Sequence, residues 1–354
     1  MKRINVVLVS MIVVIVLSTG CNGSSSESSS NSANSGKVKK GPAITMTLKS
    51  DGKKAEIVLY GEGAATLNWG DGSPVESVEF DRISKTFSHT YSDVKEYTVE
   101  ITGKNIMRLE CERLNLTSLD VSNCPTLTKL SCHNNQLTSL DVSNNPALTS
   151  LHTNQNKLTS LDVSKNPALE ELLCANNQLT SLDVSKNPVL KDLGCPANQL
   201  TSLDVSKNPA LIELYCQGNQ LTSLDVSKNP ALKRLNCQIN KISSLDLSKN
   251  AIVEQLFCSW NKMTSIDLSQ NPELTLVYFA ENELTNVVLG DNPKLISVWF
   301  HNNQLSAQAL NALLEMLHAN AITGKKVTVY KNPGADACNK SIGTKKGWIV
   351  EQTL

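Results

Sequence analysis

This sequence has no net charge and few aromatic residues. Its 354 residues carry 33 basic and 33 acidic side chains, so the formal net charge is zero. Such a chain lacks the positive field that gathers nucleic acids or anionic membranes, and we expect neither as a partner. Aromatics make up 4% of the residues against 40% for all hydrophobic residues, which predicts cores built from aliphatic side chains.

A hydrophobic run long enough to span a membrane is also missing. The apolar stretch from Val6 to Leu17 is about a dozen residues long, whereas a spanning helix needs roughly 20. It follows Lys2-Arg3 and precedes the small residues Ser18-Thr19-Gly20. This pattern is typical of an export signal, which we assign to residues 1–20.

The residues around Cys21 bear on how the exported chain is held. Ser18-Thr19-Gly20-Cys21 resembles a bacterial lipoprotein signal, which implies lipidation of Cys21 and a lipid anchor at the outer membrane or cell surface. The small residues Ser18 and Gly20 also suit ordinary signal cleavage, so that alternative stays open. Residues 21–42 are mostly Ser, Asn, Gly and Lys and predict a flexible tether.

Residues 43–103 alternate apolar and polar positions between Gly and Asp turns, which predicts a small antiparallel β-sandwich. Asn68-Trp69-Gly70-Asp71-Gly72-Ser73, followed by His89-Thr90-Tyr91, resembles the polycystic-kidney-disease-type (PKD-like) immunoglobulin-like domains. Leu67 stands where that family usually has Trp. We interpret Asp71 and His89 as a structural hydrogen-bonded pair.

A 21-residue repeat occupies residues 104–305. One unit runs Leu127-x-x-Leu130-x-Cys132-x-x-Asn135-x-Leu137-x-x-Leu140-Asp141-Val142-Ser143-x-Asn145-Pro146 and resembles the leucine-rich repeat. Ten such units predict a parallel-stranded solenoid, because no single unit can bury its own leucines. The fold class is therefore β-rich: a small sandwich, then a leucine-rich-repeat solenoid, then an α/β cap over residues 306–354.

Seven cysteines share one inward strand position of the repeat: Cys111, Cys132, Cys174, Cys195, Cys216, Cys237 and Cys258. Side chains stacked at the strand spacing of about 4.8 Å lie farther apart than a disulfide requires, so we expect free, buried thiols. This cysteine ladder resembles one branch of the internalin family of bacterial surface adhesins. The resemblance implies adhesion or partner binding.

Polar rows also recur in phase with the repeat. Two rows of Asn, represented by Asn135 and Asn145, are interpreted as turn architecture. A row of Asp from Asp120 to Asp267 could in principle bind calcium, but Asp also accepts hydrogen bonds from turn backbone, which is the interpretation we favour.

The cap is expected to be atypical, as terminal repeats usually are. Ser306 can cap a helix through Leu310, Leu313, Leu314 and Leu317, whose spacing places them on one face. Strands are expected at Val327–Val329 and Trp348–Val350, with a short helix over residues 337–345 between them.

We find no catalytic centre, metal site or cofactor site. The five His are scattered along the chain, and no nucleophile with a base or paired carboxylates converge in the sequence. The protein is therefore predicted not to be an enzyme, with no metal and no cofactor.

Differences between repeats fall on the outward positions of the strands, which we expect to form the concave face of the solenoid. Its early part, with Glu171 and Asp192, is interpreted as solvated. Its later part gathers aromatic and apolar side chains, which often anchor ligands. The candidate binding residues are Tyr215, Ile239, Phe257, Trp260, Tyr278, Trp299 and His301.

Three functions are compatible with these sequence patterns. The first is a monomeric surface protein whose concave face binds a protein partner in adhesion or host/cell interaction. The second is a glycan-binding lipoprotein that uses the same rings as stacking platforms. The third is a structural spacer, which would not need variable aromatic side chains on the later part of the face. A different interpretation of these side chains is that they only cover the C-terminal end of the solenoid.

Overall fold

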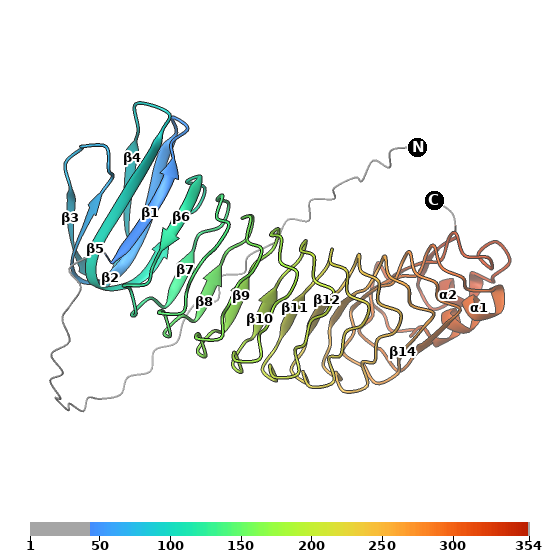
Figure 1. Ribbon diagram of the computed structural model, residues 1–354. Helices are drawn as coiled ribbons and strands as arrows, with labels where there is room; N and C mark the ends of the chain where they lie inside the picture. Colours follow the sequence, from blue (N-terminus) through green and yellow to red (C-terminus); the bar gives the residue numbers. More distant parts are fainter. Residues whose placement is uncertain (1–42, 353–354) are drawn as a thin grey trace, which may run out of the picture. The chain divides into compact units, whose positions relative to one another are not determined.

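The computed structural model describes residues 43–352 (Figure 1). The export signal, the tether and Cys21 lie outside the described residues. No helix among residues 43–352 has both the length and the apolar character needed to cross a membrane.

The first part of the described chain is an antiparallel arrangement of five strands. They are β1 (Ile44–Lys49), β2 (Lys54–Asn68), β3 (Glu76–Asp81), β4 (Lys85–Thr90) and β5 (Glu96–Glu110). Strand β2 pairs with β4 along its first half and with β3 along its second half, and it pairs with β5 along both halves. Irregularities at Tyr60/Gly61 and Glu62/Ala65 let the long strands bend between the two groups. Gly61 is required there because a Cβ would lie 2.3 Å from the carbonyl oxygen of Asn105.

Strand β5 carries the chain directly into the solenoid. Its first half pairs antiparallel with β1, and its last residues, Arg108–Glu110, pair in parallel with β7 (Lys129–Ser131). Strand β6 (Leu116–Asp120) also pairs with β1. The expected boundary at residue 103 therefore lies inside one continuous strand, and both parts share one sheet.

Asp71 and His89 hold a turn of the first part together. His89 Nε2 lies 2.7 Å from Asp71 Oδ2, and the imidazole stacks on the buried Trp69 ring with centroids 5.1 Å apart. Hydrogen bonds from Ser73, and secondly from His89, lower the pKa of Asp71 to about 2. Since both groups are engaged with neighbouring structural elements, this geometry agrees with the structural interpretation of the pair.

The solenoid is a stack of short parallel strands in exact register. After β5 and β7 come β8 (Ser150–His152), β9 (Glu171–Leu173), β10 (Asp192–Gly194), β11 (Glu213–Tyr215), β12 (Arg234–Asn236), β13 (Gln255–Phe257), β15 (Leu276–Tyr278) and β17 (Ser297–Trp299). Two cap strands, β18 (Lys326–Thr328) and β19 (Ile349–Glu351), continue the same sheet. A second small sheet pairs β14 (Ser265–Leu268) with β16 (Asn286–Leu289). The predicted fold class, a β-rich leucine-rich-repeat solenoid, is confirmed.

The core is uniform from coil to coil. The central leucine or valine of each rung is at most 1% exposed, and so are the seven cysteines of the ladder. All nine cysteines among the described residues are free thiols, and Cys237 Sγ lies 3.3 Å from Cys258 Sγ. Burial raises the pKa of Cys195 to about 12, so the thiols stay protonated and unreactive at neutral pH.

The first Asn row ties each coil to its neighbour. Asn198 Oδ1 accepts from the backbone N–H of Leu179 at 3.0 Å. Its Nδ2 donates to the carbonyl oxygens of Cys174 and Cys195 at 3.0 and 3.2 Å. One buried amide thus satisfies backbone groups of two consecutive coils, which makes the row architectural.

The aspartate row forms turns. Asp204 Oδ1 accepts from the backbone N–H of Ser206 at 2.8 Å, and the other seven members repeat this contact. Hydrogen bonds from Ser206 are the main cause of the lowered pKa of Asp204, ahead of the charge of Lys207. These contacts support the turn interpretation over calcium binding.

The cap closes the C-terminal end of the core. Helix α1 (Ala307–Met316) begins after Ser306, whose Oγ accepts from the backbone N–H of Ala309, and it buries Leu310, Leu313 and Leu314. Helix α2 (Ser341–Thr344) is shorter than the expected helix over residues 337–345. Trp348 is buried, and its Nε1 donates to the carbonyl oxygen of His318 at 2.8 Å.

Asn198→Ala tests the role of the first Asn row. The variant leaves buried backbone groups of two coils without partners, so we expect a loss of about 2–4 kcal/mol in the free energy of unfolding. Urea unfolding followed by circular dichroism measures it. Thr201→Ala, an exposed position of the same coil, serves as the control. Equal midpoints for both variants would contradict the architectural role.

Candidate functional site

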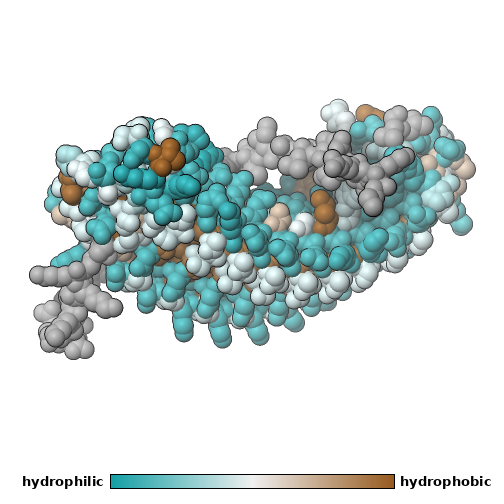
Figure 2. Space-filling model, turned by 45° about the horizontal axis from the view of Figure 1, so that its top comes forward, coloured by the Kyte–Doolittle hydropathy of each residue, from teal (hydrophilic) through white to brown (hydrophobic). Residues whose placement is uncertain are grey.

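The outward side chains of the parallel strands form a continuous surface, here called the strand face. Each rung contributes three outward positions, for example Glu213, Tyr215 and Gln217 around the buried Leu214 and Cys216 of β11. Because the strands are parallel and in register, equivalent positions line up as three columns along the sheet. Figure 2 shows a largely hydrophilic exterior with hydrophobic side chains in separate small groups.

The C-terminal half of the strand face carries a chain of touching rings, here called the aromatic ladder: Phe257, Tyr278, Trp299, His301 and Tyr330. Phe257 meets Tyr278 edge to face at 5.0 Å between centroids, and Tyr278 stacks on Trp299 at 4.2 Å. Trp299 lies 6.0 Å from His301, which stacks on Tyr330 at 4.4 Å. The first four were predicted from the sequence, and the structure brings them together.

The orientation of these rings matters for what they can bind. Tyr278 and Trp299 are nearly parallel, with 10° between their planes, and their centroids are about as far apart as neighbouring strands. Their faces are therefore turned toward each other along the stack, and ring edges point outward. The buried Nε1–H of Trp299 has no hydrogen-bond partner among the described residues.

Ile239 and Trp260 lie beside the aromatic ladder, at the turn that leaves the strand. Both are 58% exposed, and their backbones adopt positive φ values of 53° and 61°. Equivalent turn positions on other rungs hold Asn134, Gln155, Asn176, Ala197, Gly218, Glu281 and Asn302. A β-branched residue in the left-handed region is strained, and an exposed indole gains nothing from burial. Folding therefore explains neither residue.

Tyr215 is separated from the other predicted residues. It lies two rungs before Phe257, and its hydroxyl donates to Glu213 Oε2 at 2.7 Å. Tyr330 was missed by sequence reasoning because it follows the last regular repeat. Continuing the strand register from Trp299 to Thr328 places Tyr330 directly after His301 in the third column, and that register was the available signal.

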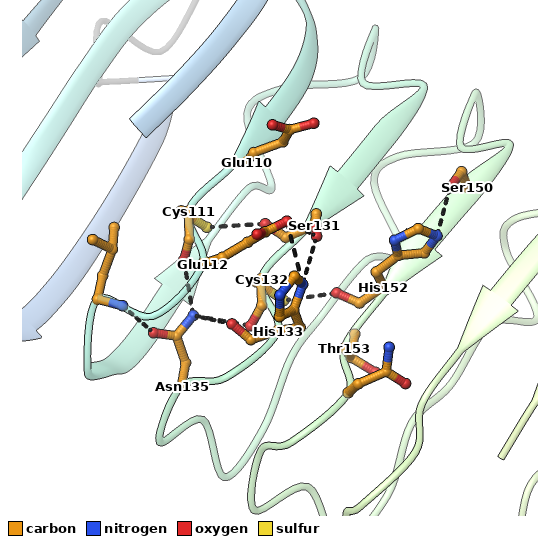
Figure 3. Close-up of polar contacts among 12 residues, drawn as sticks. Glu110, Cys111, Glu112, Ser131, Cys132, His133, Asn135, Ser150, His152 and Thr153 are labelled. Atoms are coloured by element: carbon orange, nitrogen blue, oxygen red, sulfur yellow. Dashed lines mark hydrogen bonds and ion pairs between the residues drawn. The ribbon is translucent and has the colours of Figure 1, made fainter. Parts of the chain in front are cut away.

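The N-terminal half of the strand face contains two Ser-His-Glu groups that the sequence did not reveal. Figure 3 shows the first group and, from the second, Ser150 and His152. Ser131 Oγ donates to Glu112 Oε1 at 2.6 Å, and His133 Nδ1 lies 3.2 Å from both oxygens. In the next group, Glu171 Oε2 lies 2.7 Å from Ser150 Oγ and 2.9 Å from His152 Nε2.

These two groups differ from a catalytic triad. In a triad the carboxylate holds the ring nitrogen opposite the one that faces the nucleophile. Here one ring nitrogen of each His contacts both the hydroxyl and the carboxylate, so each group is a closed triangle. The hydrogen bond from His152 is the main cause of the low pKa of Glu171, about 2. The geometry is therefore that of a surface hydrogen-bond network and differs from that of a triad.

The strand face shows no cluster of side chains suited to bind a metal ion among the described residues. Within residues 43–352, no three His, Cys, Asp or Glu side chains are placed to hold one ion. Burial lowers the pKa of His133, which favours the neutral ring at pH 7.

The middle of the strand face holds a run of charges on consecutive rungs. Glu171, Asp192, Glu213 and Arg234 occupy the first column, and Arg234 pairs with Glu213. Asp192, which the sequence places in a solvated region, is half-buried. Burial, and then the charge of Glu171, raise its pKa to about 6, and its Oδ1 is inaccessible to solvent without a hydrogen bond.

Neither the protein-family models nor the curated proteins gave a match to this chain. Among solved structures, the chain is similar to the functional domain of InlJ from Listeria monocytogenes, which includes a cysteine ladder. The two share 34% identity with a TM-score of 0.62 over 70% of this chain, which spans 53% of the InlJ chain.

Two more distant structures share the fold alone. One is the octameric complex of Latrophilin 3, Unc5D and FLRT2 (LRR), at 18% identity, a TM-score of 0.51, and 65% and 77% coverage of this chain and that chain. The other is the plant peptide hormone receptor RGFR1 in complex with RGF2, at 19% identity, a TM-score of 0.52, and 60% and 37% coverage. The chain therefore has a leucine-rich-repeat fold, and it is similar to an internalin-type protein that also carries a cysteine ladder.

Proposed function

We propose that this is a non-enzymatic, exported binding protein whose strand face holds a protein partner, in adhesion or another interaction at the cell surface. The observation that carries the proposal is the aromatic ladder flanked by Ile239 and Trp260. Exposed apolar side chains held in a strained backbone are disfavoured in the free protein, and burial against a partner would offset that penalty. Trp and Tyr are also the residues most enriched at interface hot spots.

Ring orientation favours a protein over a glycan. A sugar stacks on the open face of a ring, but Tyr278 has Phe257 on one side and Trp299 on the other. A protein surface can pack against ring edges and against the exposed Ile239. Trp260 supports the glycan alternative, because it is exposed and stacks on no other ring among residues 43–352.

The comparisons support the same class of function. RGFR1, which shares the fold, is a receptor in complex with RGF2, so this fold can serve as a receptor surface. InlJ carries the same ladder of cysteines in a domain described as functional. Attachment through a lipid on Cys21, display at the outer membrane or cell surface, and a monomeric state complete the proposal.

Trp260→Ala tests the surface directly. We expect it to weaken partner binding by tenfold or more, because an exposed Trp contributes about 2 kcal/mol or more when it anchors an interface. The chain from Asn22 onward would be screened against arrayed extracellular proteins and arrayed glycans, and hits quantified by surface plasmon resonance.

Gln155→Ala is the matched control, since Gln155 occupies the same turn position five rungs from the first residue of the ladder. It should bind like the wild type. Hits confined to glycans and lost in Trp260→Ala would replace the protein partner by a sugar. Protein hits that Trp260→Ala leaves unchanged would contradict the proposed surface.

Ile239→Asn separates stability from binding. Asn tolerates the left-handed backbone that Ile239 adopts, so the variant should unfold at a higher urea concentration, by about 0.5–1 kcal/mol. The same variant should bind the partner more weakly than the wild type. A less stable variant would show that Ile239 is there for folding, against the role we assign to it.

A further inference from the structure

We propose that the strand face recognises its protein partner through a basic side chain, a lysine or arginine, that docks against Asp192. This inference rests on the proposed function and specifies the chemistry of the partner. It is carried by the hydrogen-bonding state of Asp192 and its neighbours.

Asp192 differs from the carboxylates on either side of it. Glu171, one rung before, is engaged by His152 at 2.9 Å and by Ser150 at 2.7 Å. Glu213, one rung after, is paired with Arg234 and accepts from the Tyr215 hydroxyl.

Asp192 forms no ion pair among the described residues, and its Oδ1 has neither solvent nor a donor. The flanking carboxylates therefore have donors within the chain, and this one has none among residues 43–352. Asp192 as a residue is only half-buried, so part of its carboxylate stays within reach of a partner, and a cation placed there would offset the cost of its partly desolvated charge.

The chemistry of the unpaired group favours a cationic ligand. A guanidinium or ammonium group carries positive charge and several N–H donors, and a carboxylate that lacks both kinds of partner can accept them.

The surroundings of Asp192 also suit the long stem of a basic residue. In the second column, Leu173 Cδ2 lies 2.8 Å from the place where a Cβ of Gly194 would be, so Leu173 covers the bare backbone there. Half-buried Tyr215 follows on the next rung. Methylene groups of Lys or Arg pack on such side chains while the charged end reaches a carboxylate.

The distance to the aromatic ladder constrains the partner further. Asp192 and Tyr278 lie on rungs four strand spacings apart, from β10 through β11, β12 and β13 to β15. This is roughly 19 Å at 4.8 Å per strand. An extended polypeptide covers that span in about six residues. A partner segment should therefore carry a basic residue about six positions from a large apolar one.

Binding should weaken in mild acid. Burial, and then the charge of Glu171, oppose the ionisation of Asp192, whereas Arg234 and His152 favour it. The balance raises the pKa of Asp192 to about 6. Below that pH the carboxyl becomes neutral, which disfavours a basic ligand.

The test is selection from a phage library of random 16-residue peptides on the immobilised chain from Asn22 onward. The wild type is compared with Asp192→Asn and Trp260→Ala. Glu110→Gln, a strand-face carboxylate paired with Arg108, is the matched control. We expect wild-type peptides enriched in Lys or Arg about six residues from an aromatic or large aliphatic residue.

Synthetic versions of these peptides should bind the wild type at least tenfold more tightly than Asp192→Asn at pH 7.5. They should bind both proteins equally at pH 5, and Glu110→Gln should match the wild type at both pH values. Peptides without basic residues, or peptides that bind Asp192→Asn as tightly as the wild type, would overturn the inference.

The variants distinguish the two proposals. Binding lost in Trp260→Ala but kept in Asp192→Asn leaves the proposed surface standing and removes the basic contact. Binding that neither variant changes, or a library that yields no binder, contradicts both.

The stability of Asp192→Asn, measured by urea unfolding, shows whether this variant folds. The pKa of Asp192 is raised from 3.8 to about 6 on folding, so its charge destabilises the folded state at neutral pH, and this effect disappears as the pH falls below about 4. Asp192→Asn should thus have a higher urea midpoint than the wild type at pH 7.5 and the same midpoint near pH 3.5. A lower midpoint at pH 7.5 would mean that the carboxylate is satisfied within the chain, against the inference.

Discussion

The buried amide of the first Asn row is the contact on which the solenoid depends. Each amide accepts from a backbone N–H of the preceding coil and donates to carbonyl oxygens of that coil and its own. Coils are therefore held by their nearest neighbours, as in other repeat proteins. The constraint applies to the turns and the core and leaves the outward strand positions free to vary. The proposed binding surface lies on these outward positions, which the packing of the coils does not constrain.

The strand face divides into three zones along the stack. At its start, Ser, His and Glu side chains satisfy one another, and this zone needs no ligand. In the middle, Asp192 and Gln217 retain acceptors that no internal donor meets. At the end, rings stack on rings, with Trp260 and Ile239 exposed beside them. The middle zone thus has polar groups without donors, and the last zone has exposed apolar side chains. A partner that spans both zones would contact both sets of groups.

The features predictable from the sequence were those that repeat or are local. The in-phase Leu, Cys and Asn positions predicted the buried rows, and Ser306 predicted the start of α1, because each follows from one coil or one helical turn. The ladder residues from Phe257 to His301 were found from alternation within a strand. Register then brought these residues into contact.

The features that were missed depend on contacts between coils. Glu112 meets Ser131 and His133 only because a third-column residue of one rung reaches side chains of the next. The burial of Asp192 arises from its neighbours across the stack and leaves no mark on its own repeat. The entry of β5 into the solenoid depends on pairing with β1 on one half and β7 on the other. Local composition carries no information about such a change of partner.

The most direct measurement is photo-crosslinking from the strand face to a bound protein partner. A photoreactive amino acid would be placed at position 260, and in a second protein at position 201, on an exposed turn away from the strands. The account predicts a crosslinked adduct with the protein partner from position 260 and none from position 201. An adduct from position 201 alone would place the partner elsewhere and contradict the claim that the strand face is the binding surface.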